Sequence, residues 1–243
     1  MIEIKNLVKK FGDLTAVNDV TLKVARGEFF AVLGPNAAGK TTMIRILAGL
    51  LKPSSGTAAV AGFNVLTDPL EARRRLAYVP DFPFLYDKLT PWEFFRFTGQ
   101  LFHMSEERIE SASRELIPRF HLEAFISKPI EGLSHGTKQR VAIVSALLHD
   151  PEVLVIDEPM VGLDPQHARV VKDILKERTR TGMTVFLSTH QLSVAEEMAD
   201  RIGIMHQGRM VAVGTAEELR KQSGERGALE EVFLAATANT GAV

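Results

Sequence analysis

The fold of this chain is decided by the stretch Gly34-Pro35-Asn36-Ala37-Ala38-Gly39-Lys40-Thr41-Thr42, which contains the pattern G-x-x-x-x-G-K-[ST]. The apolar run Phe29-Phe30-Ala31-Val32-Leu33 comes directly before it, and a helix-like run, Thr42 to Leu47, ends it. A strand that leads through a glycine-rich turn into a helix points several backbone N–H groups at one place, where the helix dipole favours an anion. The stretch therefore predicts a nucleotide phosphate site, in which Lys40 reaches the β- and γ-phosphates and Thr41 binds Mg²⁺.

Composition excludes several classes of function. The chain has 29 Lys and Arg against 30 Asp and Glu, so its formal net charge of -1 gives no field of one sign that would attract nucleic acid. It has no cysteine, which excludes a disulfide scaffold and a thiolate nucleophile and suits a reducing cytoplasm. Apolar stretches such as Val141 to Leu148 are far shorter than the ~20 residues that span a bilayer. We therefore expect no nucleic-acid partner, and we expect any membrane role to come through a partner chain.

Two patterns of apolar residues predict two kinds of strand. Residues Ile2 to Val8 and Ala16 to Val24 place apolar residues near every second position, as half-buried strands do. The runs Phe29 to Leu33, Val153 to Ile156 and Thr184 to Leu187 are continuously apolar, which is typical of a parallel sheet buried on both faces. The sequence thus predicts an α/β protein: a P-loop NTPase core with a mixed, mainly parallel sheet, an N-terminal antiparallel β-subdomain and an inserted helical subdomain.

Helical periodicity marks the predicted insertion. Residues Pro91 to His103 and Ser105 to Phe120 have the spacing of amphipathic helices, and plausible helix starts lie at Thr90-Pro91 and Met104-Ser105. Near the end of the chain, His206-Gln207-Gly208-Arg209 is a hairpin candidate. The predicted organisation is a single domain over 1–243, with the core and its antiparallel β-subdomain over 1–81 and 151–215, the helical subdomain over 82–150, and C-terminal helices with a frayed tail over 216–243.

Charged residues follow two of the predicted buried strands. Asp157 and Glu158 come directly after Val153 to Ile156, at the carboxyl end where parallel sheets place their ligands. Asp157 is expected to orient Mg²⁺, and Glu158 to take a proton from the attacking water as general base. His190 follows another apolar strand, and at this edge a neutral imidazole can hydrogen-bond the γ-phosphate. Solvated carboxylates and a structural histidine are the alternative interpretations, and the nearby phosphate loop disfavours both.

Two further segments carry a family resemblance. Leu133-Ser134-His135-Gly136-Thr137-Lys138-Gln139-Arg140 lies just before Asp157-Glu158, and Gly162-Leu163-Asp164-Pro165 lies just after it. With the phosphate loop and His190, this order resembles the ATP-binding subunit of ABC transporters over about residues 2–234. The resemblance implies a head-to-tail dimer with a second copy of the chain or a paralogous ATPase. Each ATP would lie between the phosphate loop of one subunit and the signature segment, Ser134 to Gly136, of the other.

The resemblance also implies roles for individual residues. Glu158, His190 and Lys40 are expected to be catalytic. Asp164 belongs to a loop that contacts the opposite subunit, and Phe11 stacks on adenine, which contributes about 1–3 kcal/mol, although a phenylalanine at the core edge is the alternative interpretation. The residues expected to bind ATP are Phe11, Gly34, Pro35, Asn36, Ala37, Ala38, Gly39, Lys40, Thr41, Thr42, Asp81, Ser134, His135, Gly136 and Asp164, and those expected to bind Mg²⁺ are Thr41, Asp81 and Asp157.

Four residues depart from the commonest family pattern. Ala37 replaces a glycine, and its methyl group costs about 1–2 kcal/mol if this position needs a positive φ, but nothing in a right-handed conformation. His135 also replaces a glycine, and we expect it to cap the helix rather than to donate to the γ-phosphate. Thr137 stands where glutamine or methionine is commoner. Asp81 replaces a glutamine, and a carboxylate there would be a stronger, charged Mg²⁺ ligand without a donor.

The segment from Phe82 to Phe102 is rich in aromatic side chains, including Phe84 and Tyr86. Core packing explains some of them, and the excess predicts an apolar groove. In the family, such a groove receives a short cytoplasmic helix of the integral membrane permease, a helix-in-groove contact. We therefore expect a cytoplasmic subunit bound peripherally to the inner face of the cell membrane through its permease.

The expected function is that of an ATP-hydrolysing motor, in which ATP closes the dimer and energises transport through the membrane subunit. Gly162 to Pro165 and the terminal Leu229-Glu230-Glu231-Val232-Phe233-Leu234 resemble export-type subunits. A single-cassette ATPase that serves a cytoplasmic assembly process is the alternative function. A nucleotide sensor with weak catalysis is a third, if Ala37, Asp81 and His135 together impair turnover. Chromosome-type members are excluded, because no sustained heptads occur here.

Overall fold

The computed structural model describes residues 1–222 and 233–234. Among these residues, six strands form the central sheet in the order β10-β9-β3-β8-β7-β6. All neighbouring pairs are parallel except β10 with β9, which is the antiparallel hairpin predicted around residues 206–209. The strands are β3 (Phe29–Leu33), β6 (Leu76–Val79), β7 (Val153–Asp157), β8 (Thr184–Thr189), β9 (Arg201–His206) and β10 (Arg209–Gly214).

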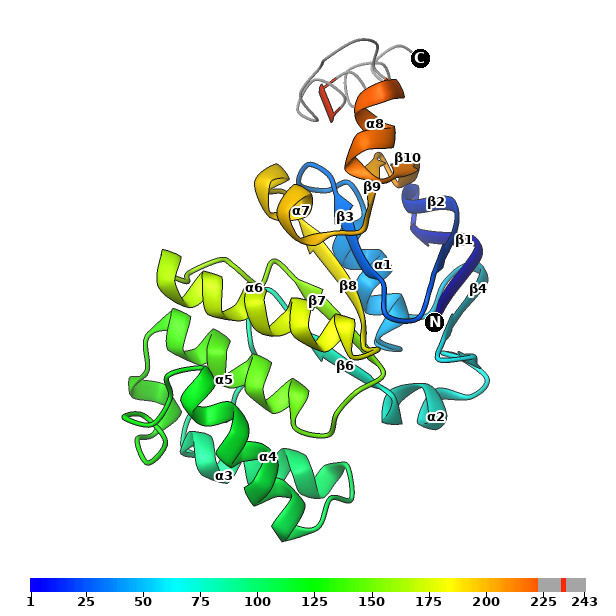
Figure 1. Ribbon diagram of the computed structural model, residues 1–243. Coiled ribbons are helices and arrows are strands. Elements are labelled where there is room, and N and C mark those ends of the chain that lie inside the picture. Colours follow the sequence, from blue (N-terminus) through cyan, green and yellow to red (C-terminus); the bar gives the residue numbers. More distant parts are fainter. Residues whose placement is uncertain (223–232, 235–243) are drawn as a thin grey trace.

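A second, antiparallel sheet lies beside the first, as the alternating N-terminal pattern predicts (Figure 1). Its strand order is β2-β1-β4-β5, and every pairing in it is antiparallel. Its strands are β1 (Ile2–Phe11), β2 (Leu14–Val24), β4 (Ser55–Val60) and β5 (Phe63–Asn64). The predicted fold class, an α/β core with an antiparallel β-subdomain, is therefore confirmed.

The hydrophobic core has two layers, one on each face of the central sheet. Phe29, Ala31 and Leu33 of β3 pack into one buried cluster with α5 (His135–Leu147), α6 and α7. Phe30 and Val32 pack into the other with α1 and the antiparallel sheet. This alternation follows from the period of two in a strand, and it explains why β3 must be apolar at every position. The helices that cover the sheet are α1 (Lys40–Leu47), α2 (Pro69–Arg74), α6 (Pro165–Arg180), α7 (Leu192–Met198) and α8 (Ala216–Gln222).

Three helices between β6 and β7 lie at one end of the molecule (Figure 1). Thr90 begins the first with a complete capping box, since its side chain accepts from Glu93 N–H and the Glu93 carboxylate accepts from Thr90 N–H. Ser105 caps the second, again as the sequence predicts. These helices are α3 (Pro91–Leu101), α4 (Glu106–Arg119) and α5 (His135–Leu147), and a 3-10 turn, Ile130–Gly132, precedes α5.

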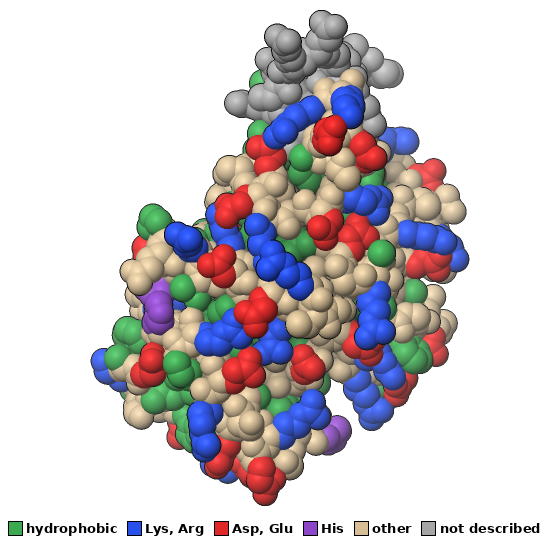
Figure 2. All heavy atoms as spheres, viewed as in Figure 1, with side chains coloured by type: hydrophobic (Ala, Val, Ile, Leu, Met, Phe, Trp, Pro, Cys, Tyr) green, Lys and Arg blue, Asp and Glu red, His purple; other side chains and the backbone are tan. Residues whose placement is uncertain are grey.

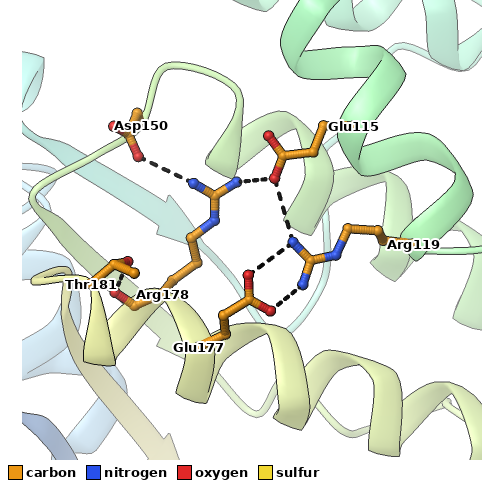
Figure 3. A network of polar contacts seen from close by, with 6 residues as sticks. All are labelled: Glu115, Arg119, Asp150, Glu177, Arg178 and Thr181. Carbon is orange, nitrogen blue, oxygen red and sulfur yellow. Dashed lines mark hydrogen bonds and ion pairs between the residues drawn. The ribbon is translucent and has the colours of Figure 1, made fainter.

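An ion-pair network joins α4 to α6 (Figure 3). Arg178 bonds Glu115 at 2.8 Å and lies 3.5 Å from Asp150, and Arg119 contacts both Glu115 and Glu177. Elsewhere on this face, charges of both signs are interspersed without a large patch of either (Figure 2). No helix in the described part of the chain is long and apolar enough to cross a membrane. The predicted tail from Thr237 to Val243 and most of the terminal segment from Leu229 lie outside the described residues.

Candidate nucleotide-binding site

The phosphate loop follows β3 and ends at the first turn of α1, and two of its glycines are required by space. A Cβ at Gly34 would lie 2.3 Å from the Met205 carbonyl oxygen, and one at Gly39 would lie 2.2 Å from the Ala16 carbonyl oxygen. Gly39 also has a φ of +105°, which side chains rarely adopt. Ala37 has a φ of +63°. Of the two geometries considered for this departure, the structure therefore has the one in which the methyl group is strained, at about 1–2 kcal/mol.

Lys40 is buried at the start of α1, with 7% of its surface exposed. Its ammonium donates to the Gly34 and Pro35 carbonyl oxygens at 2.6 and 3.0 Å. Burial lowers the pKa of Lys40, and the nearby carboxylates of Glu158 and Asp157 oppose this shift. The Lys40 ammonium is thus held by two neutral carbonyl oxygens beside two carboxylates. It can exchange these weak partners for an anion, which binds an ammonium more strongly.

Asp157 is buried at the end of β7, and both of its carboxylate oxygens are held. Thr41 donates to Oδ2 at 2.9 Å, and Ser188 of β8 donates to Oδ1. The parallel register pairs Asp157 directly with Ser188, so the second contact follows from the sheet itself. The predicted Mg²⁺ ligands Thr41 and Asp157 are therefore brought together.

Glu158 follows Asp157 and lies between Thr189, the last residue of β8, and His190, the residue after it. Thr189 Oγ1 donates to Glu158 Oε2 at 3.2 Å, and His190 Nδ1 lies 2.7 Å from Oε1. Glu158 has a φ of +46°, a left-handed conformation that costs energy for any residue with a Cβ. The Ser188 carbonyl accepts from the Glu158 backbone N–H at 3.0 Å and helps to hold this bend. The Glu158 carboxylate also lies near enough to Lys40 of the phosphate loop to oppose the lowering of the Lys40 pKa.

A cavity of about 580 Å³ opens in front of these groups. Asp81 reaches it from the end of β6 and also accepts from the backbone N–H of Phe82 at 2.9 Å. Phe11 also lines the cavity, 49% exposed, with the Lys9 ammonium 4.8 Å from its ring centre. The other lining residues are Leu14, Thr15, Ala16, Asn36, Ala37, Ala38, Gly39, Lys40, Thr41, Thr42, Asp157, Glu158, Gln207 and Gly208.

The donor set suits Mg²⁺ bound together with a phosphate. Hydroxyl and carboxylate oxygens are the ligands that Mg²⁺ prefers, and it commonly takes one or two of them from protein and the rest from phosphate and water. Thr41 and Asp157 supply such a pair. No group of three or more His, Asp or Glu within the described residues could hold a metal alone. Asp81 thus lines the same cavity without forming a closed cluster with Asp157 and Glu158.

The signature segment lies away from the cavity, at the start of α5. Ser134 is exposed and caps this helix, accepting from the Thr137 N–H at 3.3 Å. His135 packs its ring against Phe82 in a tilted arrangement, with ring centres 5.6 Å apart and an interplanar angle of 56°. Its ring also covers Gly162, where an added Cβ would lie 2.1 Å from His135 Cδ2, and a Cβ at Gly136 would lie 2.6 Å from the Gly162 carbonyl oxygen. The His135 side chain therefore packs between two loops and does not cap the helix; Ser134 does.

Asp164 caps α6 in the loop that Gly162 begins. Its carboxylate accepts from the His167 N–H at 3.0 Å and lies 2.6 Å from His167 Nδ1. The backbone and side chain of His167 hold the pKa of Asp164 below its usual value. Ser134, His135, Gly136 and Asp164 are thus neighbours on one surface, and none of them lines the cavity.

Several contributors to the site were not among the expected residues. Ser188 and Thr189 hold the two carboxylates, and the strand register gives the reason, since the last residues of β8 lie beside the end of β7. The clue in the sequence is a pair of hydroxyl residues ending an otherwise apolar strand. Gln207 and Gly208 reach the cavity because the Gly208 N–H donates to the Ala38 carbonyl at 2.9 Å. This contact between distant segments leaves no short-range pattern.

Comparisons with known proteins agree with this geometry. The family model described as "ABC transporter" matches residues 17–161. The linearmycin resistance ATP-binding protein LnrL of Bacillus subtilis (strain 168) is 35% identical, over 92% of this chain and 72% of that protein. A solved ATP-binding subunit of an ABC transporter superimposes with a TM-score of 0.92 at 36% identity, covering 97% of this chain and 99% of that one. A dimeric, post-hydrolysis ATP-binding cassette bound to ADP and Pi, MJ0796, gives 0.82 at 29% identity, covering 88% and 98%.

Proposed function

This chain belongs to the ABC transporter family of ATP-binding proteins, and we propose that Glu158 is the general base with which it hydrolyses ATP. The chain is an ATPase that uses ATP and Mg²⁺, and it is the energising subunit of a transporter whose membrane-spanning part is a separate chain. The observation that carries the proposal is the Glu158 carboxylate, held between Thr189 and His190 at a cavity that Lys40 and Thr41 also line.

The roles of the residues follow from their partners. Lys40 exchanges two carbonyl oxygens for phosphate oxygens, which are charged and bind an ammonium more strongly. Thr41 and Asp157 would hold Mg²⁺, and the bound ion would neutralise charge on the transferred phosphoryl group. Glu158 takes the proton of the attacking water. His190, 52% exposed at its side chain, turns from Glu158 toward the γ-phosphate, and Asp81 orients the water or metal from β6. Phe11 stacks on the base at the cavity rim.

We propose a head-to-tail homodimer for the active form. Ser134, His135 and Gly136 lie together with the Gly162 to Asp164 loop on a surface separate from the cavity of the same chain. Ser134 is exposed at the N-terminus of α5, where its hydroxyl and the helix dipole favour an anion. This arrangement supports a composite site, in which the surface completes the cavity of a second copy.

We place the permease contact at the groove beside β6 and α3. Phe84 is 89% exposed and lines a hollow of about 210 Å³ with Phe94, Phe102 and His149. Phe82 and Tyr86 are also exposed, at 68% and 57%. An apolar patch of this kind fits a short helix from a membrane subunit, and it would place the protein on the cytoplasmic face. The name of the LnrL relative, a resistance protein, favours an export-type system.

Substitution of the base tests the proposal most sharply. Glu158→Gln keeps the size of the side chain but cannot take a proton, so turnover should fall by about 100-fold or more. ATP affinity should be retained, and an ATP-bound dimer should accumulate in light scattering. Glu152→Gln is the matched control, because Glu152 lies just before the other end of β7 and is 44% exposed. Turnover by Glu158→Gln at the rate of this control would refute the assignment.

A charge placed in the aromatic patch tests the docking surface separately. Phe84→Glu should reduce the binding of a fluorescent dye for apolar surface while the ATPase activity of the isolated chain stays unchanged. Leu50→Glu is the control, since Leu50 is 63% exposed on a different loop. Equal dye binding by the two variants would count against a groove at Phe84.

A further inference from the structure

We propose that Thr189 is a positioning residue for hydrolysis, which holds the Glu158 carboxylate in place when His190 leaves it. The inference rests on the proposed role of Glu158 as base. The Thr189 hydroxyl lies 3.2 Å from Glu158 Oε2, and His190 contacts the other oxygen. The two contacts hold both oxygens of one carboxylate, but they differ in what fixes each partner.

Thr189 is fixed by the sheet. It is the last residue of β8, its exposure is only 2%, and it is paired with Leu33 of β3. His190 lies one residue beyond the strand, with half of its side chain exposed. A residue buried in a paired strand end moves far less than an exposed side chain beyond it. Thr189 is therefore the partner that stays when His190 turns toward a phosphate.

The hydrogen bonds of Thr189 also fix the direction in which it donates. Its Oγ1 accepts from the Gln191 backbone N–H at 3.0 Å. That bond occupies a lone pair, so the single hydroxyl proton is available for Glu158 Oε2. A charge-assisted hydrogen bond to one carboxylate oxygen restricts the rotation of the whole group. Thr189 thus holds the Glu158 carboxylate in one orientation at the cavity that Glu158 lines.

Removal of the hydroxyl at constant shape tests this inference. Thr189→Val should lower kcat by about 10- to 100-fold with an unchanged KM for ATP, because the base is misplaced. Thr189→Ser keeps the donor, so its kcat and its KM for ATP should both stay close to the wild-type values. If Thr189→Val does not fold, Thr189→Ala and Thr189→Ser make the same comparison, since both lack the methyl group.

Thr184→Val is the matched control on the same strand. Thr184 is buried, and its hydroxyl bonds only Ala25 and Gly27, at the end of β8 remote from the carboxylates. Its loss should lower the melting temperature without lowering kcat. A wild-type kcat in Thr189→Val would overturn the inference, as would an equal loss of kcat in Thr184→Val or a Thr189→Ser variant that is as slow as Thr189→Val. Glu158→Gln, measured alongside, separates the two proposals: if it is inactive while Thr189→Val is normal, only the role of Thr189 fails.

Discussion

The cavity and the signature surface hold their polar side chains in different ways. In the cavity, hydrogen bonds join residues far apart in the sequence, such as Thr41 and Asp157, which are 116 positions apart. On the signature surface, Ser134 and Asp164 each accept from an N–H three residues on, as helix caps do. The cavity is therefore built by the sheet, whereas the signature surface is built by two local caps that pack against each other through His135 and Gly162.

This difference suggests different consequences of substitution. Cavity residues are already held in place before nucleotide binds, so their loss should change affinity or chemistry while the fold survives. The signature surface has few long-range polar bonds, and its geometry depends on close backbone packing. Substitutions in the signature surface should therefore first displace that surface. They should lower turnover only as a consequence of this displacement.

The largest effect is expected at Lys40. Lys40→Met keeps much of the volume of the buried side chain but removes the charge that we propose to meet the phosphates. Loss of one partner of a buried charge pair costs about 3 kcal/mol, so ATP affinity should fall about 100-fold. Equilibrium binding of a fluorescent ATP analogue measures this. Lys23→Met is the control, because Lys23 is 76% exposed at its side chain, and equal affinities for the two variants would contradict a phosphate role for Lys40.

Gly162→Ala tests the signature surface, the other region of the comparison. A methyl group there meets His135 and also suffers the cost of a φ of +79°, so unfolding in urea should show a loss of about 3 kcal/mol. Gly62→Ala separates the two causes, since Gly62 has a φ of +86° and nothing within 4 Å of an added Cβ; it should lose only about 1 kcal/mol. In a His135→Gly background, Gly162→Ala should cost no more than Gly62→Ala. An unchanged cost in that background would show that His135 is not the obstacle.

The comparison extends to two buried ionisable groups, Lys40 and His149. Lys40 in the cavity has carbonyl partners, but neither ring nitrogen of His149 in the groove makes a well-formed hydrogen bond, and its ring stacks on Phe102 at 3.6 Å. Burial outweighs the opposing effect of the Leu76 backbone and lowers the pKa of His149 to about 4. The unfolded chain therefore binds a proton below pH 6.5 that the folded chain does not bind until about pH 4. Stability should therefore fall as the pH is lowered across this window.

The expected loss between pH 7 and pH 5 is about 2 kcal/mol from His149 alone. Urea unfolding of the wild type and of His149→Leu at both pH values isolates it, because the variant keeps every other titrating group. A pH dependence of the same size in both proteins would mean that His149 titrates normally in the fold.

Short-range patterns were enough to predict much of the fold. The loop from Gly34 to Thr42 and the caps at Thr90 and Ser105 depend on neighbours in the sequence, so residue type and spacing indicated them. Contacts between distant segments left no such pattern. Ser188 and Thr189 meet the carboxylates only because of the register between β7 and β8. The side-chain direction of His135 likewise depends on two other loops, which is why packing, and not capping, turned out to be its local role.

The smallest effect is expected at Ala37, where removal of backbone strain in the phosphate loop should change the stability by a measurable amount. Ala37→Gly removes a methyl group held at a φ of +63°, a gain of about 1–2 kcal/mol. It also adds freedom to the unfolded chain, a loss of about 0.4–1 kcal/mol. The net change should be a gain of about 0.5 kcal/mol in urea unfolding. Ala142→Gly, in the interior of α5, has no such strain to relieve and should lose about 1 kcal/mol. Losses of equal size at both positions would show that the loop tolerates alanine at residue 37 without strain.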